Sequence, residues 1–580
     1  MNNLKCSSLL CALLLVFSPA PGAASKTPPP KAPVVSPLMD AMAAEMTRAQ
    51  ELLAKAAVEG QPAPYFISYT AHEVENLGIT AQHGAIQDSS SGHRRSADIL
   101  LRIGDAKLDN THGAHRLTAI RTIPLPLADD RTAIRRALWL GTNASYAKAL
   151  QDWLKVKSEK TVNAKEEDTS DDFSKENPAQ ANLAPLQAPV LDKSAWEARI
   201  RTLSLLLRNH PEVNSDTVSL AVKTEYETFV SSEGSRVAFP AQSFRIVVVA
   251  NTRADDGMDL MLVRTFEGRT ETDLPAQAEM EKQVNELAAQ LAELRKAPAA
   301  EPFDGPALLS GRAAAVFFHE VLGHRLEGQR QRGTQEGETF TKYVGKPILP
   351  DFLSVADDPT QQRAAGLPLN GYYLFDDEGQ PAQRVPLVEK GVLQQFLMSR
   401  LPIDRFNHSN GHGRAQAGRM PTGRQGNLIV SASVSRPEAE LRQQLIEEIK
   451  KQNKPYGLYF ADITSGYTLT GRFLPQAFQV VPELVYRVYA DGRPDELVRG
   501  VNIVGTPQAA LMRIEAAGNK QAVFNGICGA ESGSVPVSGV APALLFSEIE
   551  IQKAPQGNSR PPILPSPVAD AARESSKESK

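Results

Sequence analysis

The sequence predicts an α+β protein: a mixed N-terminal α/β domain, then a mostly antiparallel, β-rich C-terminal domain, with an apolar helix between them. Two observations support this prediction. Apolar and polar residues alternate with a period of two over several stretches, most clearly in Ser243–Ala250, as expected for half-buried strands. Other stretches place apolar residues at helical spacing, and the apolar fraction of 42% over 580 residues is sufficient for several large cores.

The first 24 residues have the pattern of a secretory signal peptide. Lys5 supplies a positive charge, Ser8–Phe17 is a short apolar run, and the small residues that follow predict cleavage after Ala24. The apolar run is too short to span a bilayer comfortably. Residues 25–38, rich in proline and lysine, are predicted to be a linker. We therefore expect an exported protein, either periplasmic or secreted.

Residues 39–300 are assigned to the N-terminal domain. A helix at 39–58 precedes strands at 64–108, which are broken by glycine and serine turns. Residues 156–190 are polar, charged and proline-bearing, and we expect a solvated insertion there. The domain is completed by an amphipathic helix at 194–209, strands at 218–267 and a helix at 274–296.

Residues 301–552 are assigned to the C-terminal domain. Its first part, Gly311–Phe318, has the composition of a buried helix. Strand-like runs dominate residues 370–552, and one helix interrupts them at 437–451. The tail at 553–580 is rich in proline, serine, lysine and glutamate and is predicted to be disordered.

Two histidines and a glutamate follow the buried helix, in the run His319-Glu320-Val-Leu-Gly323-His324. Neutral imidazoles are good zinc ligands, and a carboxylate beside them can take a proton from a metal-bound water. The common metallopeptidase motif, H-E-x-x-H, places both histidines on one helix face. Here they are five residues apart, which separates them by about 140° on a regular helix. They can bind one ion only if the helix ends or bulges between them, and Gly323 tolerates such a change.

The alternative is a core helix that carries two structural histidines. The cysteines favour a metal site instead. Cys6 and Cys11 lie in the predicted signal peptide, so Cys528 is the only cysteine of the predicted mature chain. It lies in the glycine-rich run Gly526–Gly529 and can supply a third ligand as a thiolate. On its own, a lone cysteine is more often a small buried hydrophobic residue.

These motifs resemble those of the TldD/PmbA family of zinc metallopeptidases, over roughly residues 300–552. The run His319–Gly328 is similar to the family's H-E-x-x-G-H-x-L-E-G. Further similar segments follow in the family's order: Asp376–Arg384, Val388–Leu393, Arg414, Pro421–Asn427, Asp462–Gly466 and Gly526–Gly529. The resemblance implies that His319, His324 and Cys528 bind zinc and that Glu320 is the catalytic base. After Cys528, however, the family's lysine and glutamine are absent from this chain.

The sequence thus predicts a zinc metallopeptidase of the HExxxH type. It would hydrolyse peptides or unfolded polypeptide segments, with Glu320 as general base on a zinc-bound water. Glu327 could itself be a zinc ligand, but the family resemblance implies that it supports a ligand instead. His408 and His412 are candidates for a substrate contact, although a solvent loop is the simpler interpretation. The alternative function is a non-catalytic exported binding subunit of a TldD/PmbA-like complex with a structural zinc; the intact motif argues against a catalytically empty subunit.

The composition also bears on partners. The formal net charge is −4, and no basic stripe occurs, so nucleic-acid binding has no electrostatic support. Beyond the signal segment, no apolar stretch is long enough to cross a membrane. The family resemblance implies a homodimer, or a heterodimer with a relative that lacks the motif. No substrate-binding residue is assigned.

Overall fold

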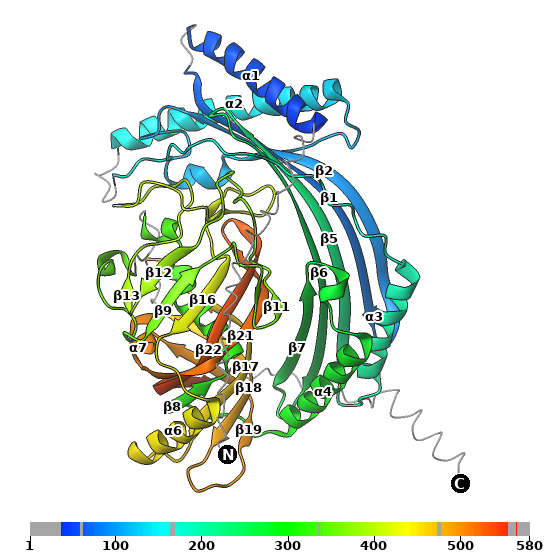
Figure 1. Cartoon of the computed structure of the whole chain (residues 1–580), viewed down its shortest axis with the longest axis vertical. Helices are drawn as coiled ribbons and strands as arrows, with labels where there is room; N and C mark the ends of the chain where they lie inside the picture. The colour runs from blue at the N-terminus through cyan, green and yellow to red at the C-terminus, as the bar shows by residue number, and fades with distance from the viewer. Residues whose placement is uncertain are drawn as a thin grey trace, which may run out of the picture.

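The structure is a computed structural model that describes residues 36–58, 62–162, 169–332, 337, 339–472, 477–554 and 564. Two large β-sheets, one from each half of the chain, lie side by side (Figure 1). The predicted signal peptide, nearly all of the predicted linker, and the predicted tail apart from its first two residues and Leu564 lie outside the described residues. The N-terminal and C-terminal domains are the two parts of the chain that contain these sheets.

The N-terminal sheet has seven strands in the described residues, in the order β3-β2-β1-β5-β6-β4, with β7 paired to β6. Their bounds are β1 (Pro64–Gln82), β2 (Ala85–Ile103), β3 (Arg121–Pro124), β4 (Gln180–Asn182), β5 (Ser215–Ser231), β6 (Arg236–Arg253) and β7 (Asp259–Gly268). All pairings are antiparallel except the short β4–β6 contact. The predicted mixed α/β character of this domain is therefore wrong. Short turns join β1 to β2, β5 to β6 and β6 to β7, and the first of them, His83-Gly84, has positive φ at both residues. Such turns join antiparallel strands.

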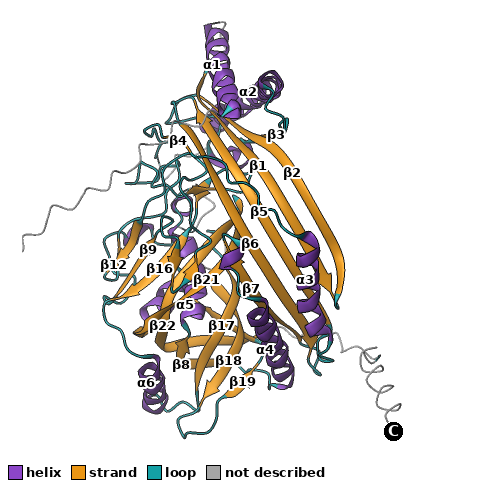
Figure 2. Cartoon of the chain, turned by 45° about the vertical axis from the view of Figure 1, so that its right-hand side comes forward, coloured by secondary structure: helices purple, strands orange, loops and turns teal. Residues whose placement is uncertain are grey.

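Four helices cover one face of this sheet at its two ends (Figures 1 and 2). Helices α1 (Pro37–Val58) and α2 (Arg131–Val162) pack at one end, and α3 (Lys193–Arg208) and α4 (Gln277–Lys296) at the other. Successive side chains of a strand point to opposite faces of the sheet, and the face without these helices lies against the C-terminal domain. On β1, Ile67 and Tyr69 pack beneath α1 and α2, whereas Phe66 and Ser68 line a small cavity with residues of the C-terminal domain.

The C-terminal sheet has eleven strands in the described part of the chain, and its main path is β13-β12-β9-β16-β22-β20-β18-β17-β8. Their bounds are β8 (Phe303–Leu309), β9 (Leu353–Asp357), β12 (Val385–Glu389), β13 (Val392–Leu393), β16 (Asn427–Ala432), β17 (Gly457–Thr468), β18 (Phe478–Val488), β19 (Glu496–Val498), β20 (Val501–Gly505), β21 (Ile514–Ala530) and β22 (Gly533–Lys553). Two two-stranded ribbons accompany it: β10 (Arg363–Ala364) with β11 (Leu367–Pro368), and β14 (Gly413–Arg414) with β15 (Thr422–Gly423). Most pairings are antiparallel, but β16–β22 and β17–β8 are parallel, so the sheet is mixed.

Helix α5 (Gly311–Val321) follows β8 directly and packs against β17, β21 and β22. It was predicted to lie between the domains, and instead it lies within the C-terminal domain. All of its residues except Arg312 are buried, as expected for a helix that is apolar nearly all round. The other helices of this domain are α6 (Glu438–Lys451), at the predicted position, and α7 (Pro507–Met512). Short 3-10 segments occur at Gly113–Thr118, Glu271–Asp273, Gly323–Leu326, Gly328–Gln331 and Thr341–Tyr343.

The predicted solvated insertion at 156–190 is partly wrong. Its first residues continue α2, where Val156 is buried, and Phe173 is only 3% exposed. The Phe173 ring packs on Phe66, with ring centroids 4.7 Å apart, and on the guanidinium of Arg400, 3.9 Å from the ring centroid. One aromatic in a polar run thus anchors the segment between the domains, although most of its neighbours are hydrophilic. Residues 163–168 lie outside the described part of the chain.

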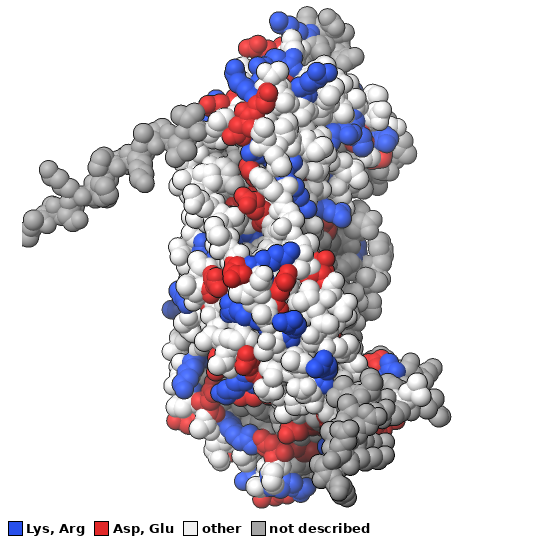
Figure 3. Space-filling model, turned by 90° about the vertical axis from the view of Figure 1, so that its right-hand side faces the viewer, with Lys and Arg blue, Asp and Glu red and all other residues white. Residues whose placement is uncertain are grey.

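Two surface properties bear on the expected partners. In the described residues, no helix combines the length and apolar character needed to cross a membrane. Figure 3 shows that lysines and arginines are interspersed with aspartates and glutamates over the face it presents. That face has no continuous stripe of basic side chains of the kind that tracks a phosphate backbone.

Candidate metal centre

The two histidines lie on separate helical segments. Helix α5 begins at the cap residue Ser310, whose hydroxyl accepts a hydrogen bond from the backbone N–H of Ala313 (3.1 Å), and it ends at Val321. Leu322 then leads into the 3-10 segment Gly323–Leu326. The helix therefore ends between His319 and His324, which is one of the two ways in which a five-residue spacing can bring both rings to one point. The predicted interruption is confirmed.

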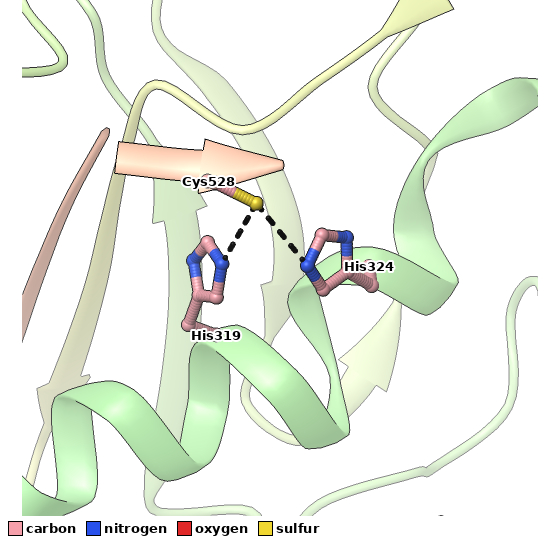
Figure 4. A group of neighbouring side chains, drawn as sticks. All are labelled: His319, His324 and Cys528. Carbon is pink, nitrogen blue, oxygen red and sulfur yellow. Dashed lines mark hydrogen bonds between the residues drawn. The ribbon is translucent and has the colours of Figure 1, made fainter. Parts of the chain in front are cut away.

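Cys528 completes a compact cluster with the two imidazoles (Figure 4). Its sulfur lies 3.3 Å from Nε2 of His319 and 3.3 Å from Nε2 of His324. The three donor atoms all lie within 4.8 Å of one another, and all three residues are buried. Cys528 reaches this position from β21, which pairs with β22 from Ile514 to Ala530. The structure thus brings together the three residues that were predicted as metal ligands.

The nitrogen–sulfur separations and the donor types of the cluster suit a zinc ion. Zinc–nitrogen bonds of about 2.0 Å and zinc–sulfur bonds of about 2.3 Å, at a tetrahedral angle, separate nitrogen from sulfur by about 3.5 Å. The observed separations of 3.3 Å are close to that value. Two imidazoles and one thiolate are also donors that zinc prefers. Three protein donors leave a fourth direction for another ligand.

The charge in the cluster favours a cation. Burial alone would raise the pKa of the Cys528 thiol, but the adjacent His319 and His324 outweigh burial and lower this pKa to about 4. Burial also opposes a charged His324, yet the negative charges of Glu327 and Cys528 prevail and raise the pKa of His324 well above its usual range. The lowered pKa favours the thiolate, which is the form that binds metals, and a metal ion and a proton compete for its negative charge.

Glu327 supports His324 as expected. Its side chain is completely buried, and one oxygen lies 3.1 Å from Nδ1 of His324. The other oxygen accepts a hydrogen bond from Nε of Arg330 (2.8 Å). Burial would raise the pKa of Glu327, but His324, Arg330 and Arg424 hold it far below its usual range. A carboxylate on the far nitrogen of a ligating imidazole fixes the ring and raises its basicity.

Glu320 lies on the wall of a pocket next to the cluster. The pocket has a volume of about 370 Å³, and its wall includes His319, Glu320, His324 and Cys528. No group among the described residues hydrogen bonds to the Glu320 carboxylate. Gly466 of β17 packs against its side chain, because a Cβ on Gly466 would lie 2.7 Å from Cγ of Glu320. The carboxylate thus lies beside the donor cluster and has no hydrogen-bond partner among the residues that the structure describes.

The other two histidine candidates lie elsewhere. His408 has a side chain that is 72% exposed, next to Glu176, as expected for a solvent loop. His412 is completely buried, with Nε2 3.2 Å from a carboxylate oxygen of Asp357 and Nδ1 2.9 Å from the carbonyl of Asn410. Neither lies in the wall of the pocket. The loop interpretation is therefore wrong for His412, because its ring can bond on both sides inside the fold.

Comparison with known proteins identifies the family. Residues 304–553 match the family model described as the PmbA/TldA metallopeptidase C-terminal domain. This match places the C-terminal domain of the chain in the PmbA/TldD metallopeptidase family. Its C-terminal half is similar to a metalloprotease from Methanocaldococcus jannaschii, with 26% identity over 231 residues, which is 40% of this chain and 47% of that protein. A metalloprotease TldD homolog from Haemophilus influenzae is 26% identical over 252 residues, or 42% and 48% of the two chains.

A third PmbA/TldD relative carries a metal in its name. The zinc metalloprotease TldD homolog from Saccharolobus solfataricus is 25% identical over 254 residues, covering 42% of this chain and 51% of that one. The matched region thus spans about half the length of these three relatives.

Solved structures support the family fold over nearly the whole chain. TldE from Thermococcus kodakarensis aligns with a TM-score of 0.58 at 12% identity and covers 88% of this chain and 100% of its own. A protein from Thermotoga maritima aligns with a TM-score of 0.56 at 14% identity, over 87% and 99% of the two chains. The family-model match thus covers the C-terminal domain, whereas the likeness in fold extends through the N-terminal sheet.

Proposed function

We propose that this PmbA/TldD member is a zinc-dependent peptidase that hydrolyses peptides or unfolded polypeptide segments. The observation that carries the proposal is the pocket, where three donors suited to zinc share one wall with the carboxylate of Glu320. His319, His324 and Cys528 would hold the ion. When bound, zinc would lower the pKa of a water molecule and polarise a peptide carbonyl.

Glu320 transfers the proton in this proposal. Its carboxylate accepts a proton from the attacking water and returns it to the leaving amine nitrogen. Two features support the role. The carboxylate has no hydrogen-bond partner among the described residues, and it is held at the pocket wall by its contact with Gly466. A general base needs both properties, since it must reach the water and must not be neutralised by a fixed partner.

The strands around the pocket suit an extended peptide. β8 pairs with β17 only at Leu458–Phe460, so among the described strands none pairs with that edge of β17 at Ile463–Thr468. β21 pairs with β22 alone among the described strands. Both strands contribute to the pocket wall. An added peptide strand would gain main-chain hydrogen bonds with little sequence selectivity, which suits unfolded segments and excludes folded proteins.

The relatives support the same class of function. Those matched in the C-terminal domain are named metalloproteases, and one of them is named a zinc metalloprotease. From the family resemblance we also propose a dimer, either of two copies or with a relative that lacks the motif. Light scattering of the purified chain tests that assembly independently of the chemistry.

The test of function compares the chain that begins at Ser25 with its Glu320→Gln variant. Zinc content is measured by atomic emission, and hydrolysis is followed on one protein in its folded and unfolded forms. We expect equal zinc content in both chains and cleavage of the unfolded form only. The rate of hydrolysis should be lower in the variant by about 10²-fold or more. The exposed Glu389→Gln serves as a control and should retain wild-type rates.

Two results would contradict the proposal. Full activity of Glu320→Gln would remove the general base. A wild-type chain that holds zinc but cleaves no peptide would point to a structural ion in a binding subunit. Structural zinc sites have four protein ligands as a rule, whereas the described residues offer three in this cluster.

A further inference from the structure

Arg424 and Gln425 contact all three donor-bearing segments at once. They follow β15 (Thr422–Gly423) and are both buried, with exposures of 0% and 1%. The donors come from positions about two hundred residues apart in sequence, on α5, on the 3-10 segment and on β21. A single pair of neighbouring side chains that reaches each of these segments is therefore placed to set their relative positions.

Gln425 joins the two histidine segments. Its Nε2 donates a hydrogen bond to the carbonyl oxygen of His319 (3.3 Å). This carbonyl belongs to the last turn of α5, where helices run out of backbone donors. The Gln425 amide also lies against Gly323, where any Cβ would overlap it. Gln425 thus caps the helix after His319 and packs on the chain just before His324.

Arg424 joins the cysteine strand to the carboxylate behind His324. Its guanidinium donates hydrogen bonds to the carbonyl of Cys528 (2.9 Å) and to the hydroxyl of Ser532 (2.8 Å). Its Nε lies 3.3 Å from the Glu327 oxygen that contacts His324, an ion pair without hydrogen-bond geometry. One rigid, planar cation therefore fixes the backbone under the sulfur and the partner of an imidazole.

The segment that carries the two residues is itself held firmly. The backbone N–H of Arg424 donates to the carbonyl of His412 (3.0 Å), and Arg414 donates to the carbonyl of Gln425 (2.5 Å). The next two backbone N–H groups, of Gly426 and Asn427, both donate to the buried carboxylate of Asp357. A side chain can position its neighbours only if its own backbone is fixed, and here it is.

We propose that Arg424 and Gln425 are positioning residues that align Cys528 with His319 and His324 for metal binding. The inference rests on the proposed function, in that it assumes the cluster binds zinc. Neither residue touches the donor atoms themselves. Substitution of either residue should therefore change the metal affinity and the sulfur-to-metal charge-transfer band, whether or not a peptide is present.

The experiment uses the full mature chain with Arg424→Lys and Gln425→Met. Lysine retains the charge but not the planar fork, and methionine retains the length but not the amide. Arg400→Lys is the control, because Arg400 is equally buried but bonds to Ser174 and Glu233 in the other domain. Zinc affinity is measured by competition with a chelator, and cobalt(II) reports thiolate ligation through its sulfur-to-metal charge-transfer band. Circular dichroism of the metal-free chains checks folding.

We expect Arg424→Lys and Gln425→Met to bind zinc about 10- to 100-fold more weakly, the usual cost of losing a group that supports a ligand. The cobalt charge-transfer band should also weaken at equal occupancy, while Arg400→Lys resembles wild type. Folded variants that bind zinc within about threefold of wild type, with an unchanged band, would overturn the inference. A metal-free variant that does not fold would also count against it for that residue, since the residue would then serve the fold. A wild-type chain that binds zinc normally but hydrolyses no peptide would contradict the proposed function and leave this inference standing.

Discussion

Gly323 lies directly against the side-chain amide of Gln425, so closely that no side chain fits at position 323. Gly323 is the first residue after the break that separates the two histidine segments. The sequence suggested that glycine was needed there for backbone freedom. In the structure its φ lies outside the left-handed region, and the close approach of Gln425 is the reason for glycine instead.

Gly323→Ala should therefore disturb the metal site through Gln425. Overpacking a buried contact costs about 1–3 kcal/mol, and displacement of Gln425 also removes the bond to the His319 carbonyl. We expect lower thermal stability and weaker zinc binding, measured by calorimetry and by chelator competition.

The double variant Gly323→Ala, Gln425→Ala discriminates this explanation from simple strain. Removing the Gln425 side chain should cancel the clash, so the double variant should bind zinc about as well as Gln425→Ala alone. Gly529→Ala is a matched control next to Cys528, since nothing lies within 4 Å of a Cβ there. Additive effects of the two substitutions would argue against a direct contact.

Removal of any one donor should abolish tight zinc binding. His319→Ala, His324→Ala and Cys528→Ser each leave two donors, and two donors rarely retain zinc against a chelator. We expect less than about a tenth of the wild-type zinc content after dialysis. His412→Asn is the control for loss of a buried histidine outside the pocket. Full zinc content in Cys528→Ser would refute the assignment of the third ligand.

The site was predictable where its chemistry is local. His319, Glu320 and His324 share one short run, and their spacing itself required the helix to end or bulge between the two histidines. Cys528 could be proposed because no other cysteine would remain after the predicted signal cleavage. Arg424 and Gln425 carry no local signal of their role, because their contacts depend on how a loop about one hundred residues downstream packs on α5.

The fold was predictable where the apolar pattern is regular. The helices at 39–58, 194–209, 274–296 and 437–451 were expected close to their observed bounds. Helix α2 was missed because Trp139, Leu140 and Leu154 are exposed on it and blur its apolar stripe. The parallel pairing of β16 with β22 joins strands about one hundred residues apart, and no local pattern encodes such a partner.

Residues 1–24 should direct export and be absent from the mature protein. The charged start, the apolar run and the small residues near Ala24 motivate this prediction. Mass spectrometry of the protein from its producing cells should find Ser25 at the N-terminus. Leu14→Arg should interrupt the apolar run and retain the precursor, whereas Ala32→Arg, outside the run, should not. An intact Met1 on cytoplasmic material would contradict the prediction.

Glu378 is a buried carboxyl group at the contact between the two domains. One of its oxygens accepts a hydrogen bond from the backbone N–H of Arg400 (2.6 Å). Burial raises the pKa of Glu378 to about 7, although Arg400 and Arg102 act in the opposite direction. Burial and the surrounding negative charge also raise the pKa of Asp376 and of Asp377. These shifts favour the protonated form of the carboxyl groups at this contact.

The free energy of unfolding should consequently decrease as the pH rises from about 4.5 to about 7. In that window the folded chain retains a proton on Glu378 that the unfolded chain has released, so higher pH favours unfolding. The loss is about 3 kcal/mol at most, at about 1.4 kcal/mol per pKa unit. Glu378→Gln keeps an oxygen for the Arg400 N–H and removes the titration, so its stability should depend less on pH. Urea unfolding at about pH 5 and about pH 7.5 measures the difference, with Glu389→Gln as an exposed control. If the free energy of unfolding of Glu378→Gln decreased with pH as much as that of wild type, a group other than Glu378 would be responsible for the pH dependence.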